Sequence, residues 1–202
     1  MVNEDKIYRK AYLLSIFTIF YNIIEGIVSL FFGYSDETMT LFGFGLDSFI
    51  EVISGTGILT MILRIRKNPS TPKSKFENTA LKITGTSFYI LAIGLTTGIL
   101  LNLFSRHKPE TTLSGIIISV ISILLMVWLM KSKYKVGCTL HSDAIIEDSK
   151  CTMVCVYMSA VLLLSSLIYE LTGFTYADEI GTAGLVYFSV FEGKEAFERS
   201  YP

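Results

Sequence analysis

The stretch Gly43-Phe44-Gly45-Leu46-Asp47-Ser48-Phe49-Ile50-Glu51 places two acids, four residues apart, among residues that are otherwise apolar or small. On a helix, positions i and i+4 lie on one face, so the carboxylates of Asp47 and Glu51 point in the same direction. An ionisable group inside a membrane-length helix is costly and is seldom present without a partner. The stretch therefore predicts a membrane helix whose acids meet partners from a later helix. The alternative is a polar contact between helices, to Lys82 or to hydroxyls of the third helix.

The composition of the whole chain is that of an integral membrane protein. Its 202 residues are 51% hydrophobic and only 17% charged, and the mean hydropathy is +0.53. A soluble domain of this length would carry more charge, and here the apolar residues form blocks of membrane length. The net charge of −1 and the absence of a Lys/Arg run with interleaved aromatics argue against a nucleic-acid partner.

Six apolar segments predict an all-α polytopic membrane protein with six transmembrane helices. We expect one domain over residues 1–202, without a soluble C-terminal domain, and a first helix that is retained rather than cleaved as a signal peptide. The predicted spans cover about residues 11–34, 38–63, 78–104, 112–130, 142–171 and 177–197.

The charge of the connections predicts the orientation. Basic residues precede the first span and gather after the second and fourth spans, whereas the alternate connections carry few. By the positive-inside rule, both termini and the two basic connections are expected to be cytoplasmic. The basic residues are Lys6, Arg9 and Lys10; Arg64, Arg66, Lys67, Lys73 and Lys75; and Lys131, Lys133 and Lys135.

A second pair with i,i+4 spacing, Cys151 and Cys155, lies on the fifth predicted helix. Asp148 extends this pair into one helical stripe, and Glu147 offers a competing register. A cysteine can also serve as a small buried apolar residue. Two carboxylates and two thiolates would together suit Zn²⁺, or a softer ion such as Cd²⁺.

Three further polar residues fall within predicted spans. Glu25, three residues after Asn22 on the first helix, could be a ligand, a proton carrier or a hydrogen-bond partner of another helix. Glu192 on the sixth helix lies nearer the cytoplasmic end, where its side chain could instead extend to the membrane surface. His107 and His141 are interpreted as solvated surface residues. No phosphate-binding glycine loop and no nucleophile–base pair is present, so an enzyme or an ATP-driven pump is not expected.

The order of the six spans and the two residue pairs resembles the cation diffusion facilitators. Residues 43–51 are similar to the second-helix motif of that family, with Asp47 and Glu51 at the two ligand positions. Residues 147–155 resemble the fifth-helix motif, Ala-Asp followed by His-x-x-x-Asp, with Cys151 at the His position and Cys155 at the Asp position. Residues 176–178 resemble its Ala-Asp-Pro motif. The likeness covers nearly the whole chain and is closest to a small branch consisting of the transmembrane domain only, on residues 21–26 and 191–193.

The resemblance implies a secondary transporter that exports divalent transition-metal cations by alternating access and proton antiport. Zn²⁺ is the leading candidate for the cation. The resemblance also implies a homodimer, in which the metal is cargo and not a prosthetic group. The plasma membrane is the default location. A rival hypothesis is a membrane metal or redox sensor, or an accessory protein, that transports nothing. Under the transport hypothesis, Asp47, Glu51, Cys151, Cys155 and Asp148 bind the metal, and Asn22, Glu25 and Glu192 carry protons or support the ligands.

Overall fold

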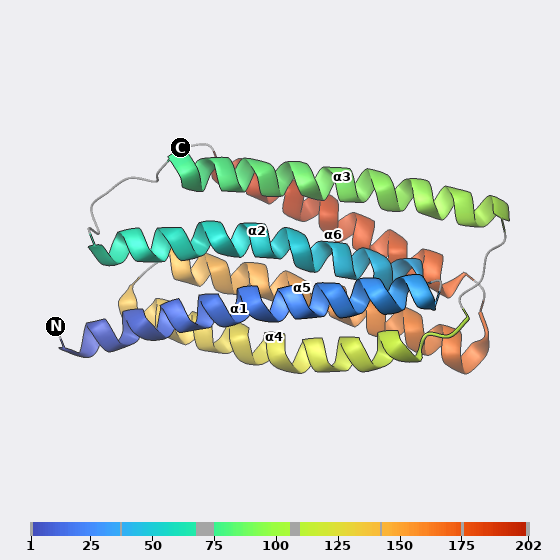
Figure 1. Cartoon of the computed structure of the whole chain (residues 1–202), viewed down its shortest axis with the longest axis horizontal. Coiled ribbons are helices and arrows are strands. Elements are labelled where there is room, and N and C mark those ends of the chain that lie inside the picture. The colour runs from blue at the N-terminus through green and yellow to red at the C-terminus, as the bar shows by residue number, and fades with distance from the viewer. Residues whose placement is uncertain are drawn as a thin grey trace.

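The computed structural model describes residues 2–36, 38–67, 75–105, 110–141, 143–174 and 176–200, and these residues form six α-helices (Figure 1). The all-α, six-helix prediction is confirmed, and most helix ends lie within a few residues of the expected positions. The helices are α1 (Val2–Ser35), α2 (Met39–Lys67), α3 (Lys75–Ser105), α4 (Leu113–Leu140), α5 (Asp143–Thr172) and α6 (Ala177–Ser200).

Two helices are longer than predicted: α1 begins at Val2 rather than near residue 11, and α4 continues about ten residues past the predicted end near residue 130. Lysine has a good helix propensity, so the lysine-rich segment after the apolar run prolongs the helix instead of ending it. The helix stops at His141, which adopts the left-handed conformation with φ 48° and donates its backbone N–H to the carbonyl of Cys138. Lys133 is therefore part of α4 and not, as the sequence suggested, of a loop.

Four helices form one bundle, in which α1 packs on α2, α4 packs on α5, and the two pairs meet through α1–α4 and α2–α5 contacts. The remaining helices, α3 and α6, pack closely on each other and join the bundle through α2 and α5. Figure 1 shows this pair along one side of the molecule, and it shows that α1 begins and α6 ends at the same end of the bundle.

The two helices that carry Asn22 and Glu51 approach each other closely through glycine. A Cβ atom on Gly33 of α1 would lie 2.5 Å from the backbone nitrogen of Phe42 in α2. In the other direction, a Cβ atom on Gly45 of α2 would lie 2.8 Å from the backbone nitrogen of Leu30 in α1. Only glycine fits at such a backbone contact, and small residues serve this purpose in membrane helix pairs.

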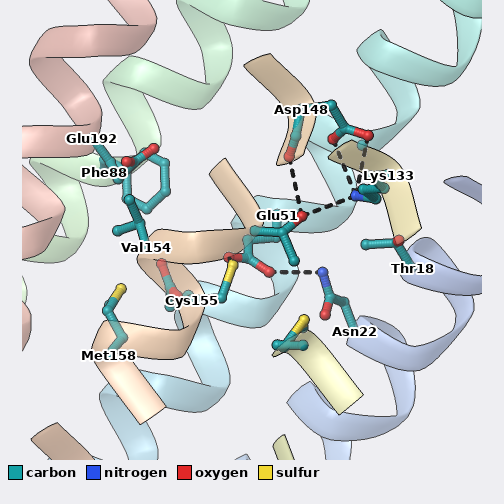
Figure 2. Close-up of a pocket in the computed structure, with 14 residues that line it drawn as sticks. Thr18, Asn22, Glu51, Phe88, Lys133, Asp148, Val154, Cys155, Met158 and Glu192 are labelled. Atoms are coloured by element: carbon teal, nitrogen blue, oxygen red, sulfur yellow. Dashed lines mark hydrogen bonds and ion pairs between the residues drawn. The ribbon is translucent and has the colours of Figure 1, made fainter. Parts of the chain in front are cut away.

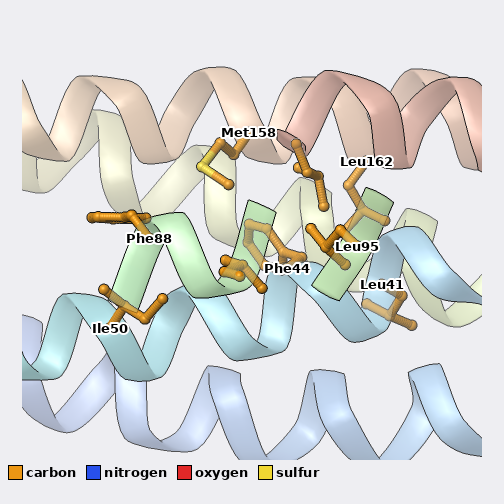
Figure 3. Close-up of a cluster of buried hydrophobic side chains, with 9 residues drawn as sticks. Leu41, Phe44, Ile50, Phe88, Leu95, Met158 and Leu162 are labelled. Atoms are coloured by element: carbon orange, nitrogen blue, oxygen red, sulfur yellow. The ribbon is translucent and has the colours of Figure 1, made fainter. Parts of the chain in front are cut away.

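Two clusters of buried apolar side chains fill the interior. The first joins α2, α3, α5 and α6 and includes Phe44, Phe88 and Met158 (Figure 3). The second joins α1, α2, α4 and α5 and includes Met126 and Cys155. Members of both clusters line one polar cavity, which therefore lies where the two clusters meet.

Five of the helices, α1 to α5, are long and apolar enough to cross a membrane by length and composition. Many of their large apolar side chains are exposed, among them Phe20, Ile90, Leu124 and Leu164, as expected for helices surrounded by lipid. The sixth helix has charged residues towards both ends, including Asp178, and is less apolar. Its role as a sixth span stays a prediction.

Candidate metal site

The cavity between the two clusters has a volume of about 40 Å³ and draws its lining from all six helices (Figure 2). This space holds a small ion or a few water molecules rather than an organic ligand. Its lining lies near the middle of α1 to α3, in the first half of α5 and in the second half of α6. The cavity thus extends from the centre of the bundle towards the end where the chain begins.

The acids of α2 occupy one wall, and both Asp47 and Glu51 line the cavity. Asp47 is only 2% exposed. The Glu51 carboxylate accepts a hydrogen bond from Nδ2 of Asn22 at 2.7 Å and contacts Sγ of Cys155 (Figure 2). Cys155 of α5 is therefore a partner of Glu51 from a later helix, and Asn22 of α1 is an additional hydrogen-bond donor to Glu51.

The first half of α5 forms the opposite wall with Asp148, Thr152 and Cys155. Their spacing of four and three residues places them on one face of the helix. The side chains of Cys151 and Glu147 lie outside the described residues, so the ligand role of Cys151 and the alternative register through Glu147 stay predictions.

A lysine, which the sequence placed in a cytoplasmic loop, lines the same cavity. Nζ of Lys133 lies 3.1 Å from both carboxylate oxygens of Asp148 and 3.0 Å from Oγ1 of Thr152. Among the described lining residues, the basic side chain is Lys133, not the Lys82 that the sequence offered as a partner. The signal for Lys133 was its place on α4, seven residues after Met126 and four after Leu129, both completely buried.

The three supporting residues predicted from the sequence do not lie together. Asn22 and Glu192 line the cavity, whereas Glu25 is not among its described lining residues. Glu25 is buried to one side and accepts hydrogen bonds from the Tyr21 hydroxyl at 2.6 Å and from Ser48 Oγ at 3.2 Å. Ser48 directly follows Asp47 on α2, so Glu25 contacts the sequence neighbour of a residue that lines the cavity.

The cavity contains oxygen atoms that lack protein partners. Within the described part of the chain, no hydrogen bond reaches the buried atoms Oδ1 of Asn22, Oδ1 of Asp47 and Oε1 of Glu192. Buried oxygens of this kind are rare in proteins unless water or an ion satisfies them. The described His, Cys, Asp and Glu side chains do not, however, converge into a group of three ready to hold a metal ion.

Other polar residues highlighted by the sequence have different positions. His141 is exposed at the end of α4, as expected of a surface residue, and His107 lies outside the described residues. Asp178, in the segment resembling Ala-Asp-Pro, accepts hydrogen bonds from the backbone nitrogens of Met39 at 2.8 Å and Thr40 at 3.1 Å. It therefore caps α2, the helix that carries the two acids of the cavity.

Comparison with known proteins agrees with the chemistry of this cavity. The family described as the cation efflux transmembrane domain matches residues 15–201, nearly the whole chain. None of the curated proteins matches the chain. A match of this extent includes α1 from residue 15, the whole of α2 to α6 and every residue of the cavity. The chain therefore belongs to the cation efflux family, whose members transport cations and are not enzymes.

Proposed function

We propose that this protein exports a divalent transition-metal cation from the cytoplasm in exchange for protons, with Zn²⁺ as the leading candidate. The observation that carries the proposal is the composition of the cavity, which is lined by Asp47, Glu51, Glu192 and the thiol of Cys155 in the interior of a membrane protein. Intramembrane carboxylates with buried, unpartnered oxygens mark an ion pathway.

The donor set favours a borderline or soft cation. Carboxylate oxygens alone suit Mg²⁺, Ca²⁺ or Mn²⁺, whereas thiolates select Zn²⁺ and softer ions. Asp47, Glu51, Cys155 and Cys151 would bind the cation, and Asp148 would be a further ligand. Glu51 and Cys155 are already in contact, so binding would require the remaining ligands to move towards that pair.

Proton exchange follows from the same donors. Carboxylic acids and thiols must lose their protons to bind a metal, so a proton-rich outer side favours release and a metal-rich inner side favours loading. Glu25, held by Tyr21 and Ser48 beside the cavity, is suited to pass protons to Asp47. Alternating access would expose the cavity to each side in turn. We further propose a homodimer in the plasma membrane with both termini cytoplasmic.

The test is Zn²⁺ and Mn²⁺ flux into proteoliposomes with and without a pH gradient, for the wild type and for Asp47→Asn/Glu51→Gln. Glu198→Gln is the matched control, because this acid lies on α6 with its side chain 66% exposed. We expect gradient-dependent Zn²⁺ flux in the wild type and the control, and none in the double variant.

The alternative outcomes identify other functions. Flux that persists in the double variant would refute the assignment of the cavity. Flux that ignores the proton gradient would indicate a channel, and binding without flux would indicate the sensor or accessory protein.

A further inference from the structure

Lys133 is the inward member of a basic cluster at the end of α4. Its neighbours in the cluster, Lys131 and Lys135, are exposed, whereas Lys133 is only 3% exposed. It continues the buried stripe of α4 formed by Met126 and Leu129. A lysine thus occupies a position that the helix otherwise fills with apolar side chains.

The ammonium group of Lys133 contacts two side chains of α5. It contacts both oxygens of Asp148 and the hydroxyl oxygen of Thr152, and Thr152 in turn donates to the backbone carbonyl of Asp148 at 3.1 Å. Figure 2 shows this group at the edge of the cavity that contains Glu51 and Asn22. Of the three N–H donors of the lysine, two make hydrogen bonds, to Oδ1 of Asp148 and to Thr152, whereas Oδ2 of Asp148 lies within ion-pair distance but accepts no hydrogen bond from the described residues.

A purely structural role explains this arrangement poorly. Burying an ion pair costs desolvation that its attraction barely repays, so apolar residues of similar size would join α4 and α5 equally well. The pair would also interact electrostatically with a bound cation, because Lys133 and Asp148 line the same cavity as Asp47 and Glu51.

We propose that Lys133 is a tethered counter-cation of the transport site. This inference rests on the proposed function. While the cavity holds no metal, the ammonium group neutralises part of its negative charge and holds Asp148 away from the other acids. When a divalent cation enters, Lys133 repels it and competes with it for Asp148. The lysine thereby weakens binding enough for the cargo to be released after each cycle.

The direction of the effect follows from charge alone. Removing the ammonium group abolishes its repulsion of the dication and frees Asp148 as a ligand, and both changes favour binding. With an effective dielectric constant of about 20, Coulomb repulsion between a unit positive charge and a dication weakens binding by at least about tenfold at any separation up to about 20 Å. Lys133→Met should therefore bind Zn²⁺ at least about tenfold more tightly than the wild type.

The experiment is calorimetric titration of Zn²⁺ into the purified full chain in detergent. It compares the wild type, Lys133→Met, Lys133→Arg and Glu51→Gln with the matched controls Lys131→Met and Lys135→Met. We expect tighter binding only in Lys133→Met, affinity like that of the wild type in the other lysine variants, and lost binding in Glu51→Gln.

Two outcomes would overturn the inference in distinguishable ways. If Glu51→Gln loses binding while Lys133→Met binds no more tightly than the wild type, Lys133 is a structural ion-pair partner only. If the wild type binds no Zn²⁺, or Glu51→Gln binds normally, the proposed function itself fails. Should Lys133→Met not fold, the double variant Lys133→Met/Asp148→Asn is compared with the single variant Asp148→Asn. These two variants differ only in the ammonium group, and neither contains a buried acid without its partner. The inference then requires tighter binding in the double variant.

Discussion

Replacing Asn22 by leucine is expected to weaken Zn²⁺ binding about tenfold, by removing the hydrogen bond that orients Glu51. Asn22 is completely buried, and its Nδ2 donates to Oε2 of Glu51 at 2.7 Å. This bond favours the ionised carboxylate, the form that binds metal. The other polar atom of the Asn22 side chain, Oδ1, is buried and accepts no hydrogen bond from the described residues. The same side chain lines the cavity.

The geometry sets the size of the effect. A hydrogen bond to a charged group contributes about 1.5–3 kcal/mol, which corresponds to roughly 10- to 150-fold in affinity. Leucine keeps the volume of the side chain, and Glu51 retains its contact with Cys155. We therefore expect a loss near the lower end of this range.

The assay is Zn²⁺ titration of Asn22→Leu, Glu51→Gln and the double variant. Glu51→Gln alone is expected to lose binding, and because the two residues act through one contact, the double variant should show no further change. Ser29→Ala is the matched control, since Ser29 is also fully buried on α1 and is not among the described lining residues of the cavity. If Asn22→Leu binds as tightly as the wild type while Glu51→Gln does not bind, Asn22 only fills space and the reasoning is refuted.

Three further predictions concern helix packing, ion preference and capping. Gly33→Ala should lower the thermal unfolding midpoint in detergent by several degrees, because the new Cβ would meet the α2 backbone. Gly94→Ala should leave that midpoint unchanged or raise it, because a Cβ atom on Gly94 would have no neighbouring atom within 4 Å. If the two substitutions lowered the midpoint equally, the packing argument would be contradicted. Cys155→Ser should weaken Zn²⁺ and Cd²⁺ binding at least about tenfold with little effect on Mn²⁺, and an equal loss for all three ions would remove the thiol from the site. Asp178→Asn should cost about 1 kcal/mol of stability through the weakened α2 cap, and an unchanged midpoint would refute that role.

The sequence by itself determined the helices, because membrane-length apolar segments and the i,i+4 spacing of acids are local properties of the chain. It predicted six helices, and the residues that the structure describes form six. It also identified Asp47, Glu51, Cys155 and Asp148, which line one cavity, and Asn22 and Glu192, which join them. Charged or thiol side chains in apolar helices are conspicuous because the membrane makes them costly.

Only the tertiary structure decided which of these residues meet and what neutralises them. It separated Glu25 from the cavity, assigned Asp178 to the cap of α2 and brought Lys133 against Asp148. The sequence places Lys131, Lys133 and Lys135 alike in a basic cytoplasmic flank, and the spacing of Lys133 from Met126 and Leu129 becomes informative only once the structure shows those two residues to be buried. The difference arises from the rotation of α4 about its axis, which the contacts of that helix with α1 and α5 determine.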